Sequence, residues 1–315
     1  MRTVDLEQLR HTLSPDAVIA AVKEALIGNW TGSFTSVEPM QILFKSEAAE
    51  LIGDCHVKAA RSQALPYFVV KLATGFYRNP QIGLPVNDGL SLLLSAKTGS
   101  PLMLFQDQGW LTAWRTAAAG ALAAGLARPK PDEPLGIIGS GQQAKLQALW
   151  ICRHLGLSRV VVWSRHSDRA KALAHRLVEA GLQAMAIDST AALAQECRLI
   201  ITATPSTAPV LMSSIVRDGT HIVAVGADSP GKQELDTALA GRCAQYIVDD
   251  SSQCLAHGEF GAAVRAGAIN ASSSVTLGEC LSRSTLPDGT ITITDLTGLG
   301  AQDLAIAALA YGTIA

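Results

Sequence analysis

Ile137-Ile138-Gly139-Ser140-Gly141-Gln142-Gln143-Ala144 is the stretch that decides the fold of this chain. It has the pattern G-x-G-x-x-A between an apolar run, which predicts a strand, and a segment that predicts a helix. The first glycine permits a tight turn, the second lets the backbone approach a pyrophosphate, and Ala144 lets helix and strand pack closely. The free N–H groups at the start of the helix attract an anion. The stretch therefore predicts a dinucleotide-binding turn, and the alternative is a glycine turn in an α/β domain that binds no ligand.

Short apolar runs alternate with helical segments around this turn. Helices are predicted at 142–154 and 167–180. The runs that predict strands are 135–138, 160–163, 184–187, 199–203, 221–225, 246–248 and 290–294. Continuous apolar strands separated by helices are typical of a parallel sheet covered on both faces. The predicted fold class is therefore α/β, with a Rossmann-type doubly wound parallel sheet.

The N-terminal part of the chain has a different pattern. A helix is predicted from Ser14-Pro15-Asp16, which supplies an N-cap, a proline and an acid, to about Asn29. The segments after it predict strands at 42–44, 67–72, 90–94 and 102–105, with turns that include Gly53-Asp54. An Ala-rich helix at 110–127 and a Pro-rich break at 129–134 follow. We expect a smaller α+β domain of residues 1–115 with 298–315, which include a helix at 302–311, and a nucleotide-binding domain of residues 116–297.

Composition excludes several classes of protein. The chain has 315 residues, of which 48% are hydrophobic and 17% charged, with a net charge of −2. These values exclude disorder and a nucleic-acid binder that works by bulk charge. We expect no signal peptide, no membrane span and, because the six cysteines are scattered singly, reduced thiols in a cytoplasmic protein. Cys254 and His257 lack a second pair of ligands, so no metal site is predicted.

The end of the second predicted strand indicates which dinucleotide binds. An acid there would bind the ribose 2′-hydroxyl, but the sequence has Ser164-Arg165-His166. A hydroxyl followed by a guanidinium suits a 2′-phosphate, so NADP(H) is favoured over NAD(H). The alternative is that Arg165 stacks on the adenine or faces solvent.

Three charged residues stand in unusual places. Lys71 lies within the apolar run 69–72, where a buried ammonium needs a partner and its pKa is easily lowered. Arg115 lies near the start of the Ala-rich helix, and Asp228 directly follows the run 221–225. Ligands in open α/β sheets bind beyond the carboxyl ends of the strands, so Asp228 is a candidate catalytic residue. The alternatives are that Lys71 pairs with an acid for stability and that Arg115 caps carbonyl groups.

Taken together, these segments resemble the ornithine cyclodeaminase/mu-crystallin family. The resemblance extends from Val69 to about Ile306 and includes the strand of Lys71 and the turn at Gly139. The other matching segments are Gly83-Leu84-Pro85, Thr98-Gly99, Arg115-Thr116-Ala117-Ala118, Thr202-Ala203-Thr204-Pro205-Ser206, and Thr294-Asp295-Leu296-Thr297-Gly298 followed by Gln302-Asp303-Leu304. Members include ornithine and lysine cyclodeaminases, an archaeal-type alanine dehydrogenase, reductases of cyclic imino acids, and mu-crystallin, which binds NADPH.

The resemblance implies hydride exchange between a nicotinamide and the Cα–N bond of a small amino or imino acid. A cyclodeaminase oxidises the α-amine to an imine, the side-chain amine attacks the imine carbon, ammonia leaves, and the hydride returns to the ring. In this reading Asp228 accepts and returns protons, with Lys71 as its partner or as a cation that positions the substrate. Arg115 would bind the substrate carboxylate or a cofactor phosphate.

The resemblance also implies a set of cofactor-binding residues. They are Thr116, Gly139, Gly141, Gln142, Gln143, Ser164, Arg165, His166, Thr202, Thr204, Val225, Gly226, Lys232 and Thr297.

Two positions depart from the family pattern. The family commonly has an arginine for the substrate carboxylate where this chain has Gln41, and a threonine where it has Val86. We expect Gln41 at the substrate site, with Lys58 supplying the missing cation. The alternative for Lys58 is a solvated lysine on a strand. These departures argue against ornithine itself as the substrate and leave the reaction class unchanged.

The leading functional prediction is an ornithine cyclodeaminase-like enzyme. The alternatives are an NAD(P)H-dependent reductase of cyclic imino acids, an alanine dehydrogenase, and a non-catalytic NADPH-binding protein similar to mu-crystallin. Between Gly89 and Ala127 the only charged residues are Lys97, Asp107 and Arg115. Since the resemblance implies a substrate and dimerisation domain there, we expect a homodimer that pairs through the N-terminal sheet and acts on a small amino or imino acid.

Overall fold

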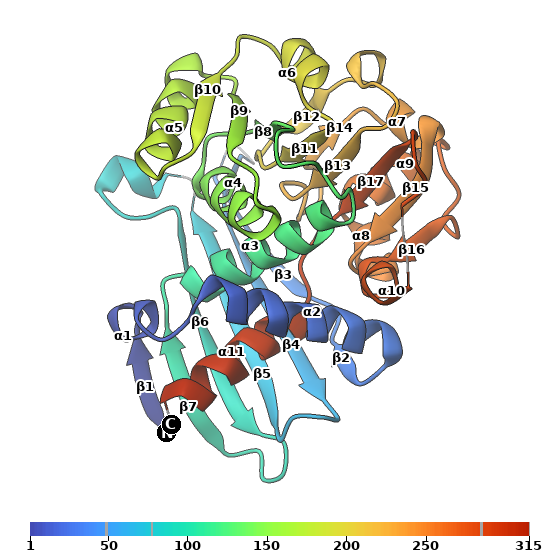
Figure 1. The fold of residues 1–315 in the computed structure, drawn as a ribbon. Helices are drawn as coiled ribbons and strands as arrows, with labels where there is room; N and C mark the ends of the chain where they lie inside the picture. Colours follow the sequence, from blue (N-terminus) through green and yellow to red (C-terminus); the bar gives the residue numbers. More distant parts are fainter. Residues whose placement is uncertain (48–49, 77, 284–285, 315) are drawn as a thin grey trace. The chain divides into compact units, whose positions relative to one another are not determined.

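The computed structural model describes residues 1–47, 50–76, 78–283 and 286–314. The chain divides into two compact units (Figure 1): unit 1 is Met1–Arg115 with Leu299–Ala315, and unit 2 is Thr116–Gly298. The expected boundaries lie within one residue of these. The functions expected of the two parts stay predictions.

Unit 2 is built on an eight-stranded sheet in the order β10-β9-β8-β11-β13-β17-β15-β16. Its neighbouring strands all pair in parallel. The strands are β8 (Leu135–Ile138), β9 (Arg159–Trp163), β10 (Gln183–Ala186), β11 (Leu199–Thr202), β13 (His221–Ala224), β15 (Cys243–Val248), β16 (Ser274–Thr276) and β17 (Ile291–Asp295). The predicted Rossmann-type parallel sheet is confirmed.

The strand order reverses next to β8. The chain moves outward from β8 through α4 (Gln142–Leu155), β9 and α5 (Ser167–Glu179) to β10, and then returns through α6 (Thr190–Glu196) to β11, which pairs with the other side of β8. Right-handed crossovers in both directions place α4 and α5 on one face of the sheet and α6 on the other. Ligands of such sheets bind beyond the carboxyl ends of the strands at this reversal.

The amino-acid pattern of unit 2 explains its layers. Every residue of β8 is buried, as expected for a strand covered on both faces. Helix α5 buries one stripe, Ala170, Leu173, Ala174 and Leu177, at the i, i+3, i+4 and i+7 spacing of an amphipathic helix. The remaining elements are β12 (Thr207–Leu211), β14 (Gln233–Leu235), α7 (Ala238–Arg242), α8 (Ser251–Ala256), α9 (Glu259–Arg265) and α10 (Leu277–Arg283), with a 3₁₀ turn at Ser213–Ile215.

Unit 1 contains a seven-stranded sheet in the order β1-β7-β6-β5-β4-β2, with β3 also paired to β4. Its strands are β1 (Arg2–Asp5), β2 (Phe34–Ser36), β3 (Met40–Lys45), β4 (Leu51–Ser62), β5 (Tyr67–Phe76), β6 (Asn87–Ser95) and β7 (Pro101–Gln106). Helix α11 (Gly300–Ile314) packs on β4 and β5, and α2 (Pro15–Thr31) packs against α11 (Figure 1). The predicted start of α2 is confirmed, because the Ser14 hydroxyl accepts a hydrogen bond from the Ala17 N–H.

One predicted turn is wrong. Gly53 and Asp54 lie inside β4, which pairs with β3 on one side and β5 on the other. A Cβ atom on Gly53 would lie 2.7 Å from Cδ1 of Phe76, so this glycine makes room for an aromatic ring against the strand. Two short elements that precede α2, β1 and α1 (Leu6–Arg10), had no counterpart in the sequence prediction.

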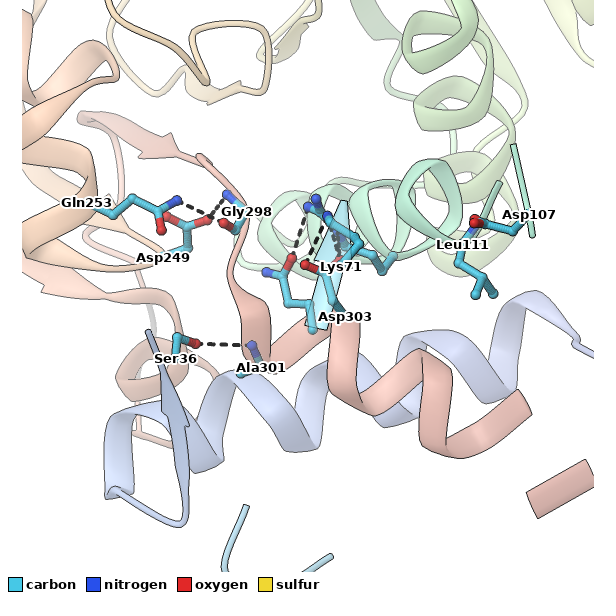
Figure 2. Close-up of polar contacts among 11 residues, drawn as sticks. Ser36, Lys71, Asp107, Leu111, Asp249, Gln253, Gly298, Ala301 and Asp303 are labelled. Carbon is cyan, nitrogen blue, oxygen red and sulfur yellow. Dashed lines mark hydrogen bonds and ion pairs between the residues drawn. The ribbon is translucent and has the colours of Figure 1, made fainter. Parts of the chain in front are cut away.

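Helix α3 (Trp110–Gly125) corresponds to the predicted Ala-rich helix. Before its first turn, the Asp107 carboxylate accepts a hydrogen bond of 2.7 Å from the Leu111 N–H (Figure 2). The boundary between the two units falls within this helix, at Arg115 and Thr116. Over the described ranges, no helix combines the length and the hydropathy that crossing a membrane requires.

Candidate active site

Lys71 and Asp303 form a buried ion pair in unit 1, with the two side chains directed toward each other (Figure 2). The lysine Nζ lies 2.9 Å from each carboxylate oxygen. Lys71 comes from the middle of β5 and Asp303 from the first turn of α11. The two side chains are 3% and 1% exposed, so the pair is shielded from water. A buried ammonium is tolerated here because the carboxylate balances its charge.

The first turn of α11 is placed by contacts with two strands. The Ala301 N–H donates to the Ser36 hydroxyl of β2 at 3.0 Å (Figure 2). A Cβ atom on Gly300 would lie 2.4 Å from the carbonyl oxygen of Ala59 in β4, so only glycine allows this approach. The helix therefore begins directly against the sheet, and its first turn brings Asp303 to the ammonium of Lys71.

Arg115 also binds Asp303. Its Nε donates to Oδ1 of Asp303 at 2.9 Å, and its Nη1 donates to Oε1 of Gln302 at 3.2 Å. One carboxylate thus serves two cations. The side-chain nitrogen of Gln302 is also buried, and no acceptor lies within hydrogen-bond distance of it among the described residues.

Lys58 adds a third cation to this cluster. It lies on β4 directly opposite Lys71 of β5, and it is buried. Burial would raise the pKa of Asp303, but Lys71, Arg115 and Lys58 outweigh it and hold this pKa below its ordinary value. Burial lowers the pKa of Lys71 to about 7; Asp303 opposes that shift, and Arg115 and Lys58 add to it. Three cations around one carboxylate make a site suited to a second carboxylate.

Gln41 lies in a neighbouring part of the same sheet. It is paired with His56 of β4, and its side-chain nitrogen lies 3.3 Å from Nε2 of His56. Nε2 of His56 in turn lies 3.7 Å from Oδ1 of Asp54. Because alternate residues of a strand share a face, His56 and Lys58 lie on the same side of β4. His56 is therefore a polar neighbour of the predicted substrate residues that the sequence analysis missed.

In unit 2, the predicted nucleotide turn joins β8 to α4. Gly139 has φ +133°, which favours glycine, and a Cβ atom there would lie 2.5 Å from the carbonyl oxygen of Ala203. Gly141 occupies the N-cap position of α4, where no side chain accepts a hydrogen bond from the first N–H groups of the helix. A Cβ atom on Gly141 would have no atom within 4 Å. The N–H groups that open α4 are accessible to an anion, so this turn fits a dinucleotide pyrophosphate.

The neighbouring glutamines link α4 to α3. Gln142 is exposed, and Gln143 Oε1 accepts a hydrogen bond of 3.4 Å from Gln147. The same nitrogen of Gln147 donates to the carbonyl oxygen of Thr116 at 3.0 Å. A Cβ atom on Gly120 would lie 1.9 Å from Oε1 of Gln147, so α3 can approach α4 only because residue 120 is glycine.

The residues predicted to select the cofactor follow β9. Arg165 and His166 are exposed, and His166 is the N-cap of α5. The Ser164 hydroxyl donates to the carbonyl oxygen of His166 at 2.8 Å, so it shapes this turn. The guanidinium of Arg165 lies at the surface beyond the end of the strand, where the adenosine ribose of a dinucleotide binds in Rossmann-type sheets.

Three residues predicted to bind the cofactor donate to a carboxylate of this chain. Thr202, Thr204 and Gly226 all hydrogen-bond to the side chain of Glu234. The Val225 N–H donates to the carbonyl oxygen of Thr202. These residues end or follow β11 and β13 at the carboxyl edge of the sheet, so the structure brings them together through an acid that the sequence analysis did not single out.

Asp228 and Lys232, both expected at the site, form an ion pair with each other. The Lys232 Nζ lies 2.6 Å from Oδ1 of Asp228, whose side chain is 47% exposed. Thr297 is buried, and its hydroxyl donates to Asp249 at 2.9 Å. The Asp249 carboxylate also accepts the Gly298 N–H (Figure 2). Thr297 therefore has a structural partner inside unit 2.

The structure thus brings together Lys71, Arg115 and Lys58, and it adds Asp303 and Gln302, which the sequence analysis did not name as site residues. A signal for Asp303 is present in the sequence, because it is the only charged residue between Gly300 and Ile314. The expected alternative for Lys71, pairing with an acid, is what the structure shows. In the described part of the chain, no three His, Cys, Asp or Glu residues are grouped so as to hold a metal ion.

A Rossmann-type sheet with an open glycine turn is typical of dinucleotide-binding proteins, and a buried cluster of cations suits a ligand that carries a carboxylate. The chain belongs to the ornithine cyclodeaminase/mu-crystallin family, whose sequence model matches residues 3–315. The resemblance seen in the sequence is therefore confirmed.

Individual relatives carry different activities in their names. The chain is 33% identical to the alanine dehydrogenase of Archaeoglobus fulgidus, over 97% of this chain and 92% of the relative. It is 36% identical to an uncharacterised cyclodeaminase of Sinorhizobium fredii, over 86% and 84% of the two chains. Among solved structures, an archaeal alanine dehydrogenase dimer with bound NAD superposes with a TM-score of 0.91 at 30% identity, covering 99% of this chain and 95% of that one.

We predict that replacing Asp303 by asparagine strongly destabilises the protein. The substitution leaves the ammonium of Lys71 and the guanidinium of Arg115 buried without their carboxylate, and breaking a buried ion pair in this way costs about 3–5 kcal/mol. Chemical denaturation followed by fluorescence measures the change.

The control is Glu50→Gln, which removes the exposed ion pair between Glu50 and Arg78. Exposed pairs contribute little, so this variant should unfold like the native protein. An Asp303→Asn protein as stable as the control would contradict the prediction.

Proposed function

We propose that this protein catalyses nicotinamide-dependent hydride exchange at the Cα–N bond of a small amino or imino acid. The observation that carries the proposal is the buried cluster in unit 1, where Lys58, Lys71 and Arg115 act on the single carboxylate of Asp303. The buried amide nitrogen of Gln302, which has no acceptor within hydrogen-bond distance among the described residues, adds a donor. Donors and positive charge in excess of acceptors suit the carboxylate common to all amino and imino acids.

Each unit supplies a separate part of the proposed chemistry. In unit 1, Lys71 and Arg115 bind and orient the substrate carboxylate, while Asp303 keeps both cations in place. In unit 2, the turn at Gly139 and Gly141 binds the pyrophosphate. A nicotinamide held by this turn would supply the acceptor or donor of the hydride. Asp228 accepts the proton that leaves the substrate amine and returns it in the reverse direction, as a general base and acid.

The specific reaction that we propose is deaminating cyclisation, in which an amino acid with a side-chain amine loses ammonia and closes a ring without net oxidation. Relatives named as cyclodeaminases support it. The second candidate is net oxidative deamination of a small amino acid. It is supported by the extent of the match to alanine dehydrogenase and by the uncharged Gln41, which departs from the family pattern.

A panel of substrates separates these reactions. Amino acids are offered with NAD⁺ or NADP⁺, and cyclic imino acids with NADH or NADPH, while ammonia release and absorbance at 340 nm are both followed. A cyclodeaminase releases ammonia with only catalytic amounts of cofactor. A dehydrogenase or reductase changes the absorbance in proportion to its product. If the protein turns over none of these substrates, the proposal is contradicted.

The Asp228→Asn variant tests whether the protein is a catalyst or a binding protein similar to mu-crystallin. Removal of a general base lowers turnover by about a hundredfold or more, because proton transfer by a positioned group typically contributes 10²–10⁴-fold. Binding of the nicotinamide cofactor is measured alongside, because Asp228 also pairs with Lys232 of the predicted cofactor-binding set. A native protein that binds the cofactor and turns over no substrate would favour the non-catalytic alternative.

We further propose that NADP(H) is the preferred cofactor, because Arg165 rather than an acid follows β9. Arg165→Ala should raise the KM for the NADP form about tenfold or more and leave the KM for the NAD form unchanged, since a charge-assisted hydrogen bond contributes about 1.5–3 kcal/mol. Steady-state kinetics with both cofactors measure the difference. Arg176→Ala, at an exposed position in the last turn of α5, the helix that follows Arg165, is the control. A native preference for NADH would argue against this role of Arg165.

The pKa of Lys71 predicts how substrate binding depends on pH. The ammonium binds a carboxylate only while it is protonated, and its pKa is lowered to about 7. The KM for the amino acid should therefore rise as the pH increases through about 7. In Lys71→Arg the side chain stays charged, so the KM should be flat over the same range. A native KM that does not change between pH 6 and 8.5 would show that Lys71 does not bind the substrate.

We also propose a cytoplasmic homodimer that pairs through the sheet of unit 1. Apolar side chains are exposed on one face of its strands, notably Ile42 and Phe44 on β3 and Leu72 on β5. An exposed apolar patch of this kind marks an interaction site. All six cysteines are free thiols, which suits a reducing compartment. Light scattering at micromolar concentration tests the assembly, and a monomer would contradict it.

A further inference from the structure

Glu234 is fully buried in the middle of β14, yet its carboxylate accepts four hydrogen bonds. Oε1 accepts the N–H of Thr204 at 2.6 Å and the hydroxyl of Thr204 at 2.8 Å. Oε2 accepts the hydroxyl of Thr202 and the N–H of Gly226, both at 2.8 Å. The donors lie at the carboxyl ends of two different strands, where Thr202 ends β11, Thr204 follows it and Gly226 follows β13, so one side chain joins these two ends.

The two joined ends lie where the sheet binds its ligand. Thr204 follows β11 and Gly226 follows β13, and these strands are neighbours. The turn at Gly139 follows β8, on the other side of β11, and packs against the carbonyl of Ala203. The carboxyl ends of β8, β11 and β13 therefore form one continuous row of contacts at the reversal of strand order. Glu234 holds two of these three ends.

Gly226 lies in close contact with the carbonyl group of Thr204 and with the side chain of Glu234. A Cβ atom on Gly226 would lie 2.2 Å from the carbonyl oxygen of Thr204 and 2.6 Å from Cδ of Glu234. The backbone of β14 is fixed by a second acid. The two oxygens of the Glu259 carboxylate accept the N–H groups of Glu234 and Leu235 at 2.5 and 3.1 Å. The spacing between the β11 and β13 loops is thus set by the carboxylate of Glu234 itself.

The chemistry of the contact requires a carboxylate. Burial raises the pKa of Glu234, and the four hydrogen bonds oppose that shift because they favour the ionised form. Two of the donors are backbone N–H groups, which cannot rotate to become acceptors. A neutral amide in place of the carboxylate would turn an NH₂ group toward one of these N–H groups, since an amide has one acceptor oxygen where a carboxylate has two.

We propose that Glu234 is a positioning residue of the dinucleotide site: its carboxylate holds the β11 and β13 loops at the spacing in which they and the Gly139 turn bind the cofactor. The inference rests on the proposed nicotinamide dependence. It explains why Thr202, Thr204 and Gly226, which the family resemblance assigns to cofactor binding, donate to this acid. Glu234 acts on the cofactor only through these residues.

The test measures cofactor binding without turnover. NADPH and NADH are titrated into the native protein and into Glu234→Gln, and the dissociation constants are obtained from the change in nicotinamide fluorescence. Loss of a charged acceptor displaces the Thr204 or the Gly226 backbone, so we expect the dissociation constant to rise about tenfold or more. Glu234→Asp keeps the charge on a shorter side chain and should recover part of the lost affinity.

Asp236→Asn is the matched control. Asp236 lies two residues further along, and its carboxylate also accepts two backbone N–H groups, from Ser213 and Ala238, both at 3.0 Å. Neither donor belongs to the predicted cofactor-binding set. Asp236→Asn should lower the thermal unfolding midpoint of the free protein, though less than Glu234→Gln does because Asp236 is only partly buried, while its cofactor affinity stays native.

Each outcome decides a separate question. A native protein that binds neither NADH nor NADPH overturns the proposed function, and the inference with it. If the native protein binds one of them and Glu234→Gln binds it equally well, only the role of Glu234 is overturned. Should Glu234→Gln fail to fold, Glu234→Asp is compared with Asp236→Asn, and equal native affinity in both variants overturns the inference.

Discussion

A carboxylate withdrawn from water must be met by cations or by hydrogen-bond donors, and this requirement governs the interior of both units. In unit 1, Asp303 is met by Lys71 and Arg115. In unit 2, Glu234 is met by four donors at the carboxyl ends of β11 and β13, and Asp249 by the N–H of Gly298 and the hydroxyl of Thr297. Each acid joins segments that are far apart in the chain.

The two units satisfy their buried acids in opposite ways, and the difference has a functional meaning. Asp303 is surrounded by an excess of cations, which pull its pKa down and leave positive charge for a ligand. Glu234 and Glu259 are held mainly by N–H and hydroxyl groups, and burial raises the pKa of each, that of Glu259 to about 8. The cluster in unit 1 therefore carries positive charge in excess, whereas the acids of unit 2 accept hydrogen bonds from the backbone.

Sequence reasoning predicted every strand of the eight-stranded sheet of unit 2 except β16, because these strands are continuous apolar runs, and the bounds of β8 were the predicted ones. It did not predict the short elements β12, β14, α6, α7, α8, α9 and α10. It failed at Gly53, where a glycine marked close packing against Phe76 and was read as a turn. Lys71, Arg115 and Lys58 were named as site residues, and the structure places them around one carboxylate. Asp303 was not named, because it meets Lys71 across 232 positions of sequence, a separation that no local pattern reports.

By itself, the sequence determined the alternation of strands and helices, the glycine turn after β8 and the absence of an acid after β9, because periodicity, backbone sterics and residue type act over a few neighbouring residues. Only the tertiary structure decided which charges meet. Thr202, Thr204 and Gly226 can be read from the sequence as cofactor-binding residues, but their shared partner, Glu234, emerges only when β11, β13 and β14 come together. Burial strengthens an ion pair such as that of Asp303 and hydrogen bonds such as those of Glu234, and burial is a property of the folded chain.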